Sequence, residues 1–180
     1  LQQQLQPKSG PIIEVPADAS LFYADDSCDE VEEKTRSYVF SPTMGKNIGS
    51  HQGAHYYTVG QRKGLGIGGK ALPLFILATD AATNTIYVGQ GEDHPGLLRK
   101  GLRVMTADIH WLREDLVMSI GEERVYKARI RYRQELSACK LIRRTDALHV
   151  IFEEPQRGIA SGQFVAWYTD DELIGSGVIA

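Results

Sequence analysis

The chain has 180 residues, of which 42% are hydrophobic and 24% are charged, and its formal net charge is −3. This composition is typical of a globular protein and excludes disordered and fibrous classes. The longest apolar stretch, Leu72–Ala78, is far shorter than a membrane span, and no signal peptide is recognisable. The two cysteines, Cys28 and Cys139, are too few for a disulfide scaffold or a zinc cluster. We therefore expect a cytoplasmic protein without membrane contact, and the absence of an initial Met indicates part of a longer chain.

The first fifty residues are predicted to be mostly irregular. Residues 1–5 are typical of the end of a helix, and residues 12–15 of a short strand. Residues 16–48 are rich in acidic side chains and include Pro and Gly. We interpret this stretch as a mobile surface insertion and allow one helical turn in its acidic run.

Regular structure is predicted to return after residue 51. Residues 55–59 have strand character, and residues 60–69 form a glycine-rich loop. The apolar runs at 74–80 and 85–89 are separated by a short polar connection, which predicts a β-hairpin. Residues 91–96 are predicted to form a loop.

From residue 101 onward the pattern is entirely β. Short alternating or apolar runs at near-regular spacing indicate a small barrel or sandwich, with a domain boundary near residues 101–106. The predicted strands are 102–111, 124–132, 137–143, 147–152, 163–168 and 172–179.

Charge is concentrated in one part of this β-rich region. Residues 99–144 hold twelve basic and six acidic side chains, although the whole chain is weakly acidic. A basic segment of this kind can bind a polyanion locally, because exposed charges act over about 10 Å at ordinary salt. The alternative is a solvated face with interspersed lysine and arginine.

Three arginines carry the clearest chemical signal in the basic segment. Arg129, Arg131 and Arg133 alternate along a predicted strand, so they would share one exposed face. Guanidinium groups fit phosphate, and Tyr132 could stack on a base, although an ideal strand would direct it to the other face. Salt bridges to residues 153–154 would explain the arginines equally well, and charge alone leaves both interpretations open.

Two further motifs invite a catalytic interpretation. The glycine loop at 64–69 lacks the Lys-Ser/Thr ending of a phosphate loop and is not placed between a strand and a helix. With Arg62 and Lys63 before it, it is instead predicted to be a cationic turn that touches phosphate. The pair at 93–94, Asp-His, has no further ligands at a metal-binding spacing, so a capped turn is expected there.

Several ordered motifs resemble those of one known family, the tRNA-specific 2-thiouridylases (MnmA/TrmU). The resemblance covers residues 51–180, and the stretch at 16–48 departs from the short turn that is usual in that family. The matching segments are 56–69, 88–95, 131–134, 155–157, 162–163 and 175–179.

The resemblance implies a fold and an activity. The fold is mainly β with a small α+β part: a central tRNA-binding domain at 1–103 followed by a C-terminal antiparallel β-barrel at 104–180. Family members begin with an ATP-pyrophosphatase domain that holds a Ser-Gly-Gly-x-Asp-Ser loop and the catalytic cysteines, and this chain has no such loop. In the family, ATP adenylates the C2 oxygen of the wobble uridine, and persulfide sulfur then displaces AMP. An older name calls these enzymes tRNA (5-methylaminomethyl-2-thiouridylate)-methyltransferases, but no segment resembles a methyl-donor site.

We therefore expect a fragment that is inactive alone, with no catalytic residue, metal or cofactor of its own, and with ATP bound by the absent domain. Its expected partners are the anticodon-loop region of tRNA and, for the whole enzyme, a sulfur-donor protein. The alternatives are a free-standing β-barrel that binds RNA or protein, and a nucleotide-binding enzyme that uses the glycine loop. Family tRNA contacts match Arg131, Tyr132 and Gln163, and charge adds Arg129, Arg133, Arg62 and Lys63.

Overall fold

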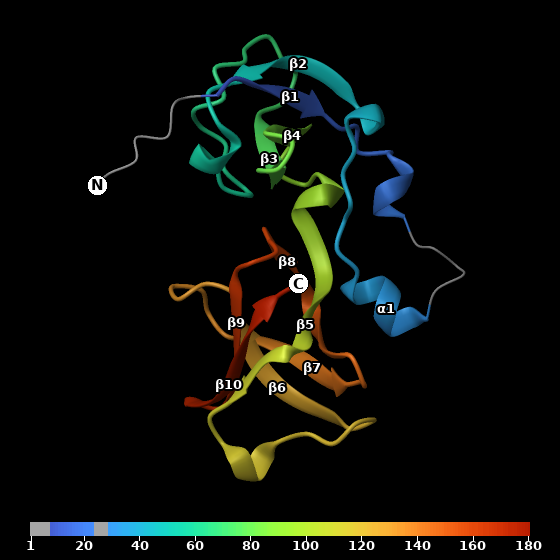
Figure 1. The fold of residues 1–180 in the computed structure, drawn as a ribbon, viewed down its shortest axis with the longest axis vertical. Coiled ribbons are helices and arrows are strands. Elements are labelled where there is room, and N and C mark those ends of the chain that lie inside the picture. Colours follow the sequence, from blue (N-terminus) through green and yellow to red (C-terminus); the bar gives the residue numbers. More distant parts are fainter. Residues whose placement is uncertain (1–7, 24–28) are drawn as a thin grey trace. The chain divides into compact units, whose positions relative to one another are not determined.

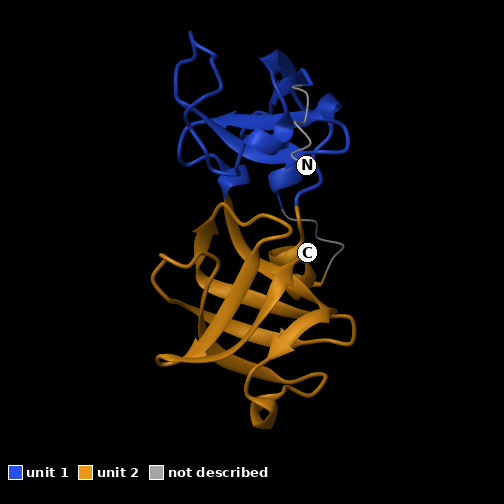
Figure 2. Cartoon of the chain, turned by 60° about the vertical axis from the view of Figure 1, so that its left-hand side comes forward, with its two compact units in different colours: residues 1–23, 38–97 blue, residues 24–37, 98–180 orange. Residues whose placement is uncertain are grey.

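The structure is a computed structural model that describes residues 8–23 and 29–180. The chain divides into two compact units, shown in separate colours in Figure 2. Unit 1 contains residues 1–23 and 38–97, and unit 2 contains residues 24–37 and 98–180. Both units are built mainly from β-strands, as the sequence predicts.

Unit 1 holds a sheet of four strands in the order β2-β1-β4-β3 (Figure 1). Strand β1 (Gly10–Glu14) pairs in parallel with β4 (Thr85–Gln90) and antiparallel with β2 (Lys46–His51). Strand β3 (Leu74–Asp80) pairs antiparallel with β4, which confirms the predicted hairpin. Asn84 adopts a positive φ of 52° in the connecting turn, a conformation that Asn tolerates better than most residues.

Both faces of this sheet are covered, which explains why its strands are apolar runs and not alternating patterns. Successive residues of one strand enter different clusters: Ile76 packs on one face, and Phe75 and Leu77 pack on the other. The first cluster includes Ile12, Leu65, Ile86 and Val88. The second includes Ile13, Val15, Tyr87 and Leu97.

Short 3-10 helices join the strands of unit 1, and one of them replaces a predicted strand. The strand expected at 55–59 is wrong, because η3 (Ala54–Tyr56) and a loop occupy this part of the chain. Gly53 has a φ of 142°, and its carbonyl accepts from the Tyr56 amide, so the backbone turns before a strand can form. The other three are η1 (Ser20–Phe22), η2 (Pro42–Met44) and η4 (Pro95–Leu97).

Unit 2 is a closed barrel of six strands in the order β10-β5-β8-β7-β6-β9, with every adjacent pair antiparallel. This confirms the predicted C-terminal barrel. Strand β5 begins at Leu98 and runs without a break through residues 101–106, so the two units divide before it. The barrel strands are β5 (Leu98–Trp111), β6 (Glu123–Arg129), β7 (Ser137–Arg143), β8 (Ala147–Arg157), β9 (Phe164–Thr169) and β10 (Glu172–Ile179), and η5 (Glu114–Leu116) follows β5.

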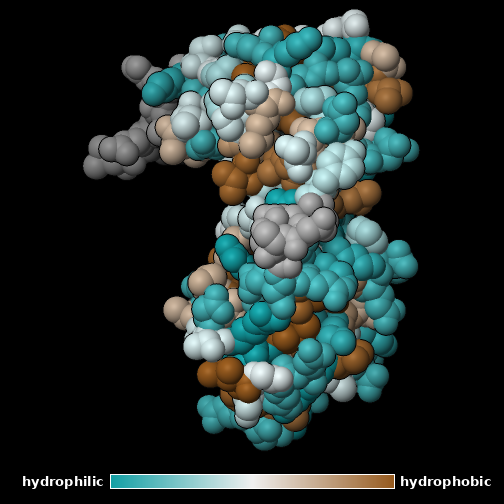
Figure 3. Space-filling view, turned by 90° about the vertical axis from the view of Figure 1, so that its right-hand side faces the viewer, coloured by the Kyte–Doolittle hydropathy of each residue, from teal (hydrophilic) through white to brown (hydrophobic). Residues whose placement is uncertain are grey.

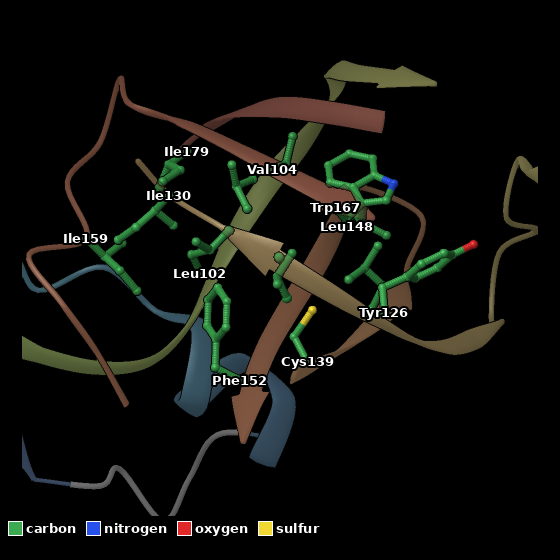
Figure 4. Close-up of a cluster of buried hydrophobic side chains, with 14 of the residues drawn as sticks. Leu102, Val104, Tyr126, Ile130, Cys139, Leu148, Phe152, Ile159, Trp167 and Ile179 are labelled. Atoms are coloured by element: carbon green, nitrogen blue, oxygen red, sulfur yellow. The ribbon is translucent and has the colours of Figure 1, made fainter. Parts of the chain in front are cut away.

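Alternate residues of the barrel strands fill its interior (Figure 4). Trp167 is fully buried and meets the ring of Trp111 edge-on, with 5.3 Å between centroids. The Cys139 side chain lies in the same core beside Phe152. Because this core is apolar and continuous, the barrel gives the segments on its outer surface a rigid support.

The acidic stretch at 16–48 contains more structure than the sequence predicts. Helix α1 (Glu30–Thr35) lies against β5 and β8 of the barrel, and residues 46–48 belong to β2. Asp29 caps the helix by accepting from the amides of Val31 and Glu32. The helical turn that the sequence allowed in the acidic run is confirmed by α1, whereas the expectation of irregular structure is wrong for the residues of β2. The predicted helix end at 1–5, and Cys28, lie outside the described residues.

Across residues 8–23 and 29–180, no helix is long and apolar enough to cross a membrane. On the face of the molecule in Figure 3, hydrophobic residues form small separate patches among hydrophilic ones.

Candidate nucleic-acid interface

The predicted arginine strand ends earlier than expected. Strand β6 stops at Arg129, and residues 131–134 form a turn in which the Gln134 amide donates to the Arg131 carbonyl at 3.1 Å. Arg131 and Arg133 therefore do not alternate along a strand with Arg129, so this part of the prediction is wrong. A regular strand would direct Tyr132 to the face opposite the arginines, but the turn leaves its side chain 85% exposed.

The turn is anchored to the neighbouring part of the barrel. Arg131 donates from Nη2 to the Gly158 carbonyl at 3.1 Å, and the Gln134 side-chain amide donates to Gln156 Oε1 at 2.5 Å. Gly158 has a φ of 73°, and a Cβ at that position would lie 2.4 Å from Arg131 Nη2. Glycine is therefore required there both by the backbone conformation and by the close approach of the arginine.

A surface hollow of about 400 Å³ lies where this turn meets strand β9. Arg129 donates to the Tyr132 carbonyl at 3.0 Å and to the Tyr168 hydroxyl at 2.9 Å. Its guanidinium carbon lies 5.4 Å and 5.0 Å from the centroids of those two rings, within cation–π range. Arg131, Gln163 and Phe164 also line the hollow, whereas Arg133 is exposed on the same turn and does not.

Sequence reasoning missed two of the residues that line the hollow, Phe164 and Tyr168. Strand β9 alternates strictly, with Val165 and Trp167 buried in the barrel and Phe164 65% exposed. The alternation of side chains along this strand could have identified them, because a period of two directs residues 164, 166 and 168 to the outer face.

The arginines of this surface lack acidic partners. Within the described part of the chain, Arg129, Arg131 and Arg133 form no ion pair with a carboxylate. The salt bridges to residues 153–154 that were the alternative explanation are therefore not present. Three neighbouring cations without a counter-charge produce a positive potential that attracts anions.

The glycine loop of unit 1 forms a second cationic surface. It is anchored by backbone hydrogen bonds between residues 60–61 and Ile76 at 2.8 and 3.0 Å, and Arg62 and Lys63 are exposed. Among the residues that the structure describes, the backbone N–H groups of 62–71 have no partner within the protein. Free N–H groups beside cationic side chains suit phosphate oxygens. The loop leads into β3 and not into a helix, so it does not fit the phosphates of ATP.

The remaining candidates for catalysis have structural roles. The His94 ring is buried, with Nδ1 accepting from the Gly96 amide and Nε2 donating to the Val15 carbonyl, both at 3.1 Å. This is the capped turn that the sequence predicts, and burial lowers the pKa of His94. Cys139 is unpaired, and burial raises the pKa of its thiol to about 12, so it is not an activated nucleophile. The described residues contain no cluster of His, Cys, Asp and Glu that could hold a metal ion.

Two family models match the chain, one for each part. Residues 28–90 match the tRNA methyl transferase PRC-barrel domain, and residues 100–179 match the aminomethyltransferase beta-barrel domain. Relatives named tRNA-specific 2-thiouridylase MnmA from Flavobacterium johnsoniae and Christiangramia forsetii are each 47% identical over the whole chain. The chain belongs to the tRNA-specific 2-thiouridylase family. It corresponds to the central and C-terminal domains of that family.

The similarity extends to more distant members of the 2-thiouridylase family. The relative from Nitrosomonas eutropha is 42% identical over 140 residues, which is 75% of this chain and 37% of the relative. The chain spans about half the length of the curated relatives that match it completely, namely 47% of the relatives from Flavobacterium johnsoniae and Christiangramia forsetii. The chain therefore corresponds to only part of a full-length 2-thiouridylase.

Proposed function

We propose that this chain is the tRNA-binding portion of an ATP-dependent tRNA 2-thiouridylase. In this proposal the central and C-terminal domains hold the tRNA while sulfur is transferred to C2 of its wobble uridine. The catalytic ATP-pyrophosphatase domain, which binds ATP and carries the reactive cysteines, belongs to the length of the relatives that this chain does not span. The proposed place of action is the cytoplasm.

The observation that carries the proposal is the surface at the end of β6. Arg129, Arg131 and Arg133 have no carboxylate partner within the described residues, and Arg129 lies over the ring of Tyr132, which is exposed. Guanidinium groups beside an exposed aromatic ring suit the phosphates and bases of unpaired RNA. Gln163 lines the same hollow, which brings together the three residues that match family tRNA contacts.

Unit 1 contributes a second proposed contact. Arg62 and Lys63 flank a loop whose N–H groups are free to bind phosphate oxygens, as described above. We propose that this loop binds the tRNA backbone without reading its sequence, because phosphate contacts position a protein on RNA but carry no base information. The anticodon-loop region is the proposed target of the barrel surface, and a sulfur-donor protein is the proposed partner of the whole enzyme.

The proposal is tested by measuring tRNA binding and ATP turnover with the purified chain. We expect binding that weakens steeply between about 50 and 200 mM salt, because each phosphate contact releases counterions. We also expect neither AMP release from ATP nor thiolation of tRNA. Absence of tRNA binding at low salt would contradict the RNA-binding role, and AMP production by the chain would contradict the assignment of catalysis to another domain.

A further inference from the structure

A pocket of about 650 Å³ in unit 1 has no part in the proposed function. Its volume lies within the range of about 300–1,000 Å³ that is typical of small-molecule sites. Strands β1 and β4 pair in parallel (Figure 1), and their last residues, Glu14 and Gln90, both line the pocket. In open α/β sheets, crevices at the carboxyl ends of parallel strands are common ligand sites, and this parallel pair provides the same arrangement.

The apolar part of the lining comes mainly from the stretch at 16–48. Pro16, Ala17 and Met44 belong to this stretch, and all three are exposed where they line the pocket. Val15, at the end of β1, adds a buried apolar residue. The pocket therefore offers an apolar surface for the body of a small molecule, beside the polar groups at the strand ends.

Three polar side chains of the pocket hold one another in place. The Glu14 carboxylate accepts from Lys70 Nζ through Oε2 and from Gln90 Nε2 through Oε1, the latter at 2.5 Å. Gln90 Oε1 in turn accepts from the Leu72 amide at 3.2 Å. The side chains of Glu14 and Lys70 are only 16% and 26% exposed. Because the removal of an ion pair from water offsets much of its attraction, this pair is better explained by fixed positions than by stability.

The side chains of the pocket retain unused hydrogen-bond donors. Both carboxylate oxygens of Glu14 and Oε1 of Gln90 already accept hydrogen bonds, and His94 uses both of its ring nitrogens. An ammonium group has three N–H donors, and that of Lys46 forms no hydrogen bond or ion pair within the described residues. Lys70 uses one of its donors on Glu14. The side chains therefore offer mainly N–H donors, which suit an anionic ligand.

The charges that line the pocket sum to one positive charge. Burial raises the pKa of Glu14, but its hydrogen bonds and the charges of Lys70 and Lys46 lower it by more, so the carboxylate is ionised at neutral pH. Burial lowers the pKa of His94, which is therefore neutral there. Two lysines and one carboxylate remain, and one anionic group on a ligand would balance them.

We propose that this pocket binds a small organic anion, a carboxylate or a phosphate monoester that carries an apolar body. Lys46 and Lys70 bind the anionic group, and Glu14 fixes the position of Lys70. The apolar body packs against the exposed residues of the stretch at 16–48. This inference goes beyond the proposed tRNA-binding function, because it concerns a different ligand and side chains that are not assigned to RNA.

The test adds three small probes to the purified chain and follows its amide and methionine methyl signals by NMR. The probes are phenyl phosphate, phenylacetate and the neutral 2-phenylethanol. At millimolar concentration, at least one of the two anions is expected to shift the signals of Thr43, Met44 and Lys46, which line the pocket. The neutral probe should shift them far less, because it lacks the charge that the lysines bind. Comparison of the two anions distinguishes a phosphate site from a carboxylate site.

Two variants separate the contribution of charge from that of apolar contact. Lys46→Gln is expected to weaken binding of the anion about 3- to 10-fold, because one cation is lost at a partly exposed site. Met44→Ser is expected to weaken it about threefold through lost apolar contact. Both residues are exposed, so unit 1 should remain folded. The matched control is Lys8→Gln, at an exposed lysine of unit 1 that does not line the pocket, and it should change nothing.

Three outcomes would each overturn the proposal. In the first, neither anion shifts the pocket signals, or the neutral probe shifts them equally. In the second, the shifts are confined to residues 62–69, which would assign binding to the glycine loop. In the third, Lys46→Gln binds the anion as tightly as the parent. None of these outcomes depends on tRNA binding, so the failure of this inference is distinguishable from the failure of the proposed function.

Discussion

The side-chain hydroxyl of Thr35 lies 2.7 Å from Nδ1 of His149, a residue 114 positions away in the chain, and both side chains are buried. The same hydroxyl lies 2.7 Å from the Val31 carbonyl, so it donates there and accepts from the imidazole N–H. This contact joins helix α1 to the barrel strand β8. Arg99 supports it by donating to the carbonyls of Thr35 and Arg36 at the end of the helix.

Thr35→Val tests how much this contact stabilises unit 2. The substitution keeps the shape of the side chain but leaves the imidazole N–H of His149 buried without an acceptor. We expect the free energy of unfolding to fall by about 1–3 kcal/mol. Tryptophan fluorescence in a urea titration is the appropriate measurement, because both tryptophans, Trp111 and Trp167, lie in unit 2. The control is Thr169→Val, at an exposed threonine of unit 2, for which a change within about 0.5 kcal/mol is expected.

His149 also predicts how stability depends on pH. Burial lowers the pKa of His149 from its ordinary value of 6.5, and this outweighs the opposing effect of the Glu32 carboxylate 3.4 Å away. Arg144 and Arg103 lower the pKa further, whereas Asp146 raises it. The unfolded chain therefore binds a proton more readily than the folded one. Stability should fall as the pH drops below about 6.5, by at most about 1.4 kcal/mol per pH unit for this one proton.

The measurement is the free energy of unfolding of unit 2 between about pH 7.5 and pH 5, above the range in which most carboxylates titrate. His149→Gln is expected to be less stable than the parent but to change less with pH over this interval. An equal pH dependence in the two proteins would show that His149 does not contribute to it.

Strand boundaries could be predicted where a local pattern and a turn coincide. The residues of β3, β7 and β10 match the predicted ranges, because each is an apolar or alternating run that ends at polar turn residues. Strand β8 continues through Pro155 to Arg157, beyond the end at residue 152 that the sequence predicts. The register between β5 and β8 shifts between Arg99 and Gly101, and this irregularity accommodates a proline that a regular ladder would not.

Contacts between distant segments could not be predicted from local patterns. The docking of α1 depends on the contact between Thr35 and His149 and on the hydrogen bond from Arg99 to the end of the helix. No local sequence pattern indicates that these distant residues are in contact. For the candidate site, charge indicated the arginines, but the hollow depends on Phe164 joining them from another strand. Local hydrophobic patterns therefore predict most of the strands. The shape of the candidate site depends on which strands become neighbours when the barrel closes, and local patterns do not predict this.

Cys139 provides a prediction about reactivity. Burial, with a smaller effect of Glu153, raises the pKa of its thiol to about 12, so roughly one molecule in ten thousand is a thiolate at pH 8. We expect Cys139 to be alkylated by iodoacetamide at least about a hundredfold more slowly in the native protein than in urea. Mass spectrometry of the peptide that contains Cys139 gives both rates. Similar rates in the two conditions would mean that this part of the barrel opens readily.

Arg131 provides the last prediction, which concerns RNA. Its side chain is exposed and is held toward the hollow by the Gly158 carbonyl, with no carboxylate partner among the described residues. Arg131→Ala should therefore weaken tRNA binding and lower the slope of log affinity against log salt by about one, because one phosphate contact is lost. The barrel should remain folded, since the Arg131 side chain is exposed and is not part of the barrel core. Lys34→Ala is the matched control, because Lys34 is already paired with Glu30 on helix α1 and should change neither quantity. The measurement is a salt titration of tRNA affinity for the parent and both variants. If a folded Arg131→Ala protein matched the parent in affinity and in slope, the turn after β6 would not be the RNA-binding surface.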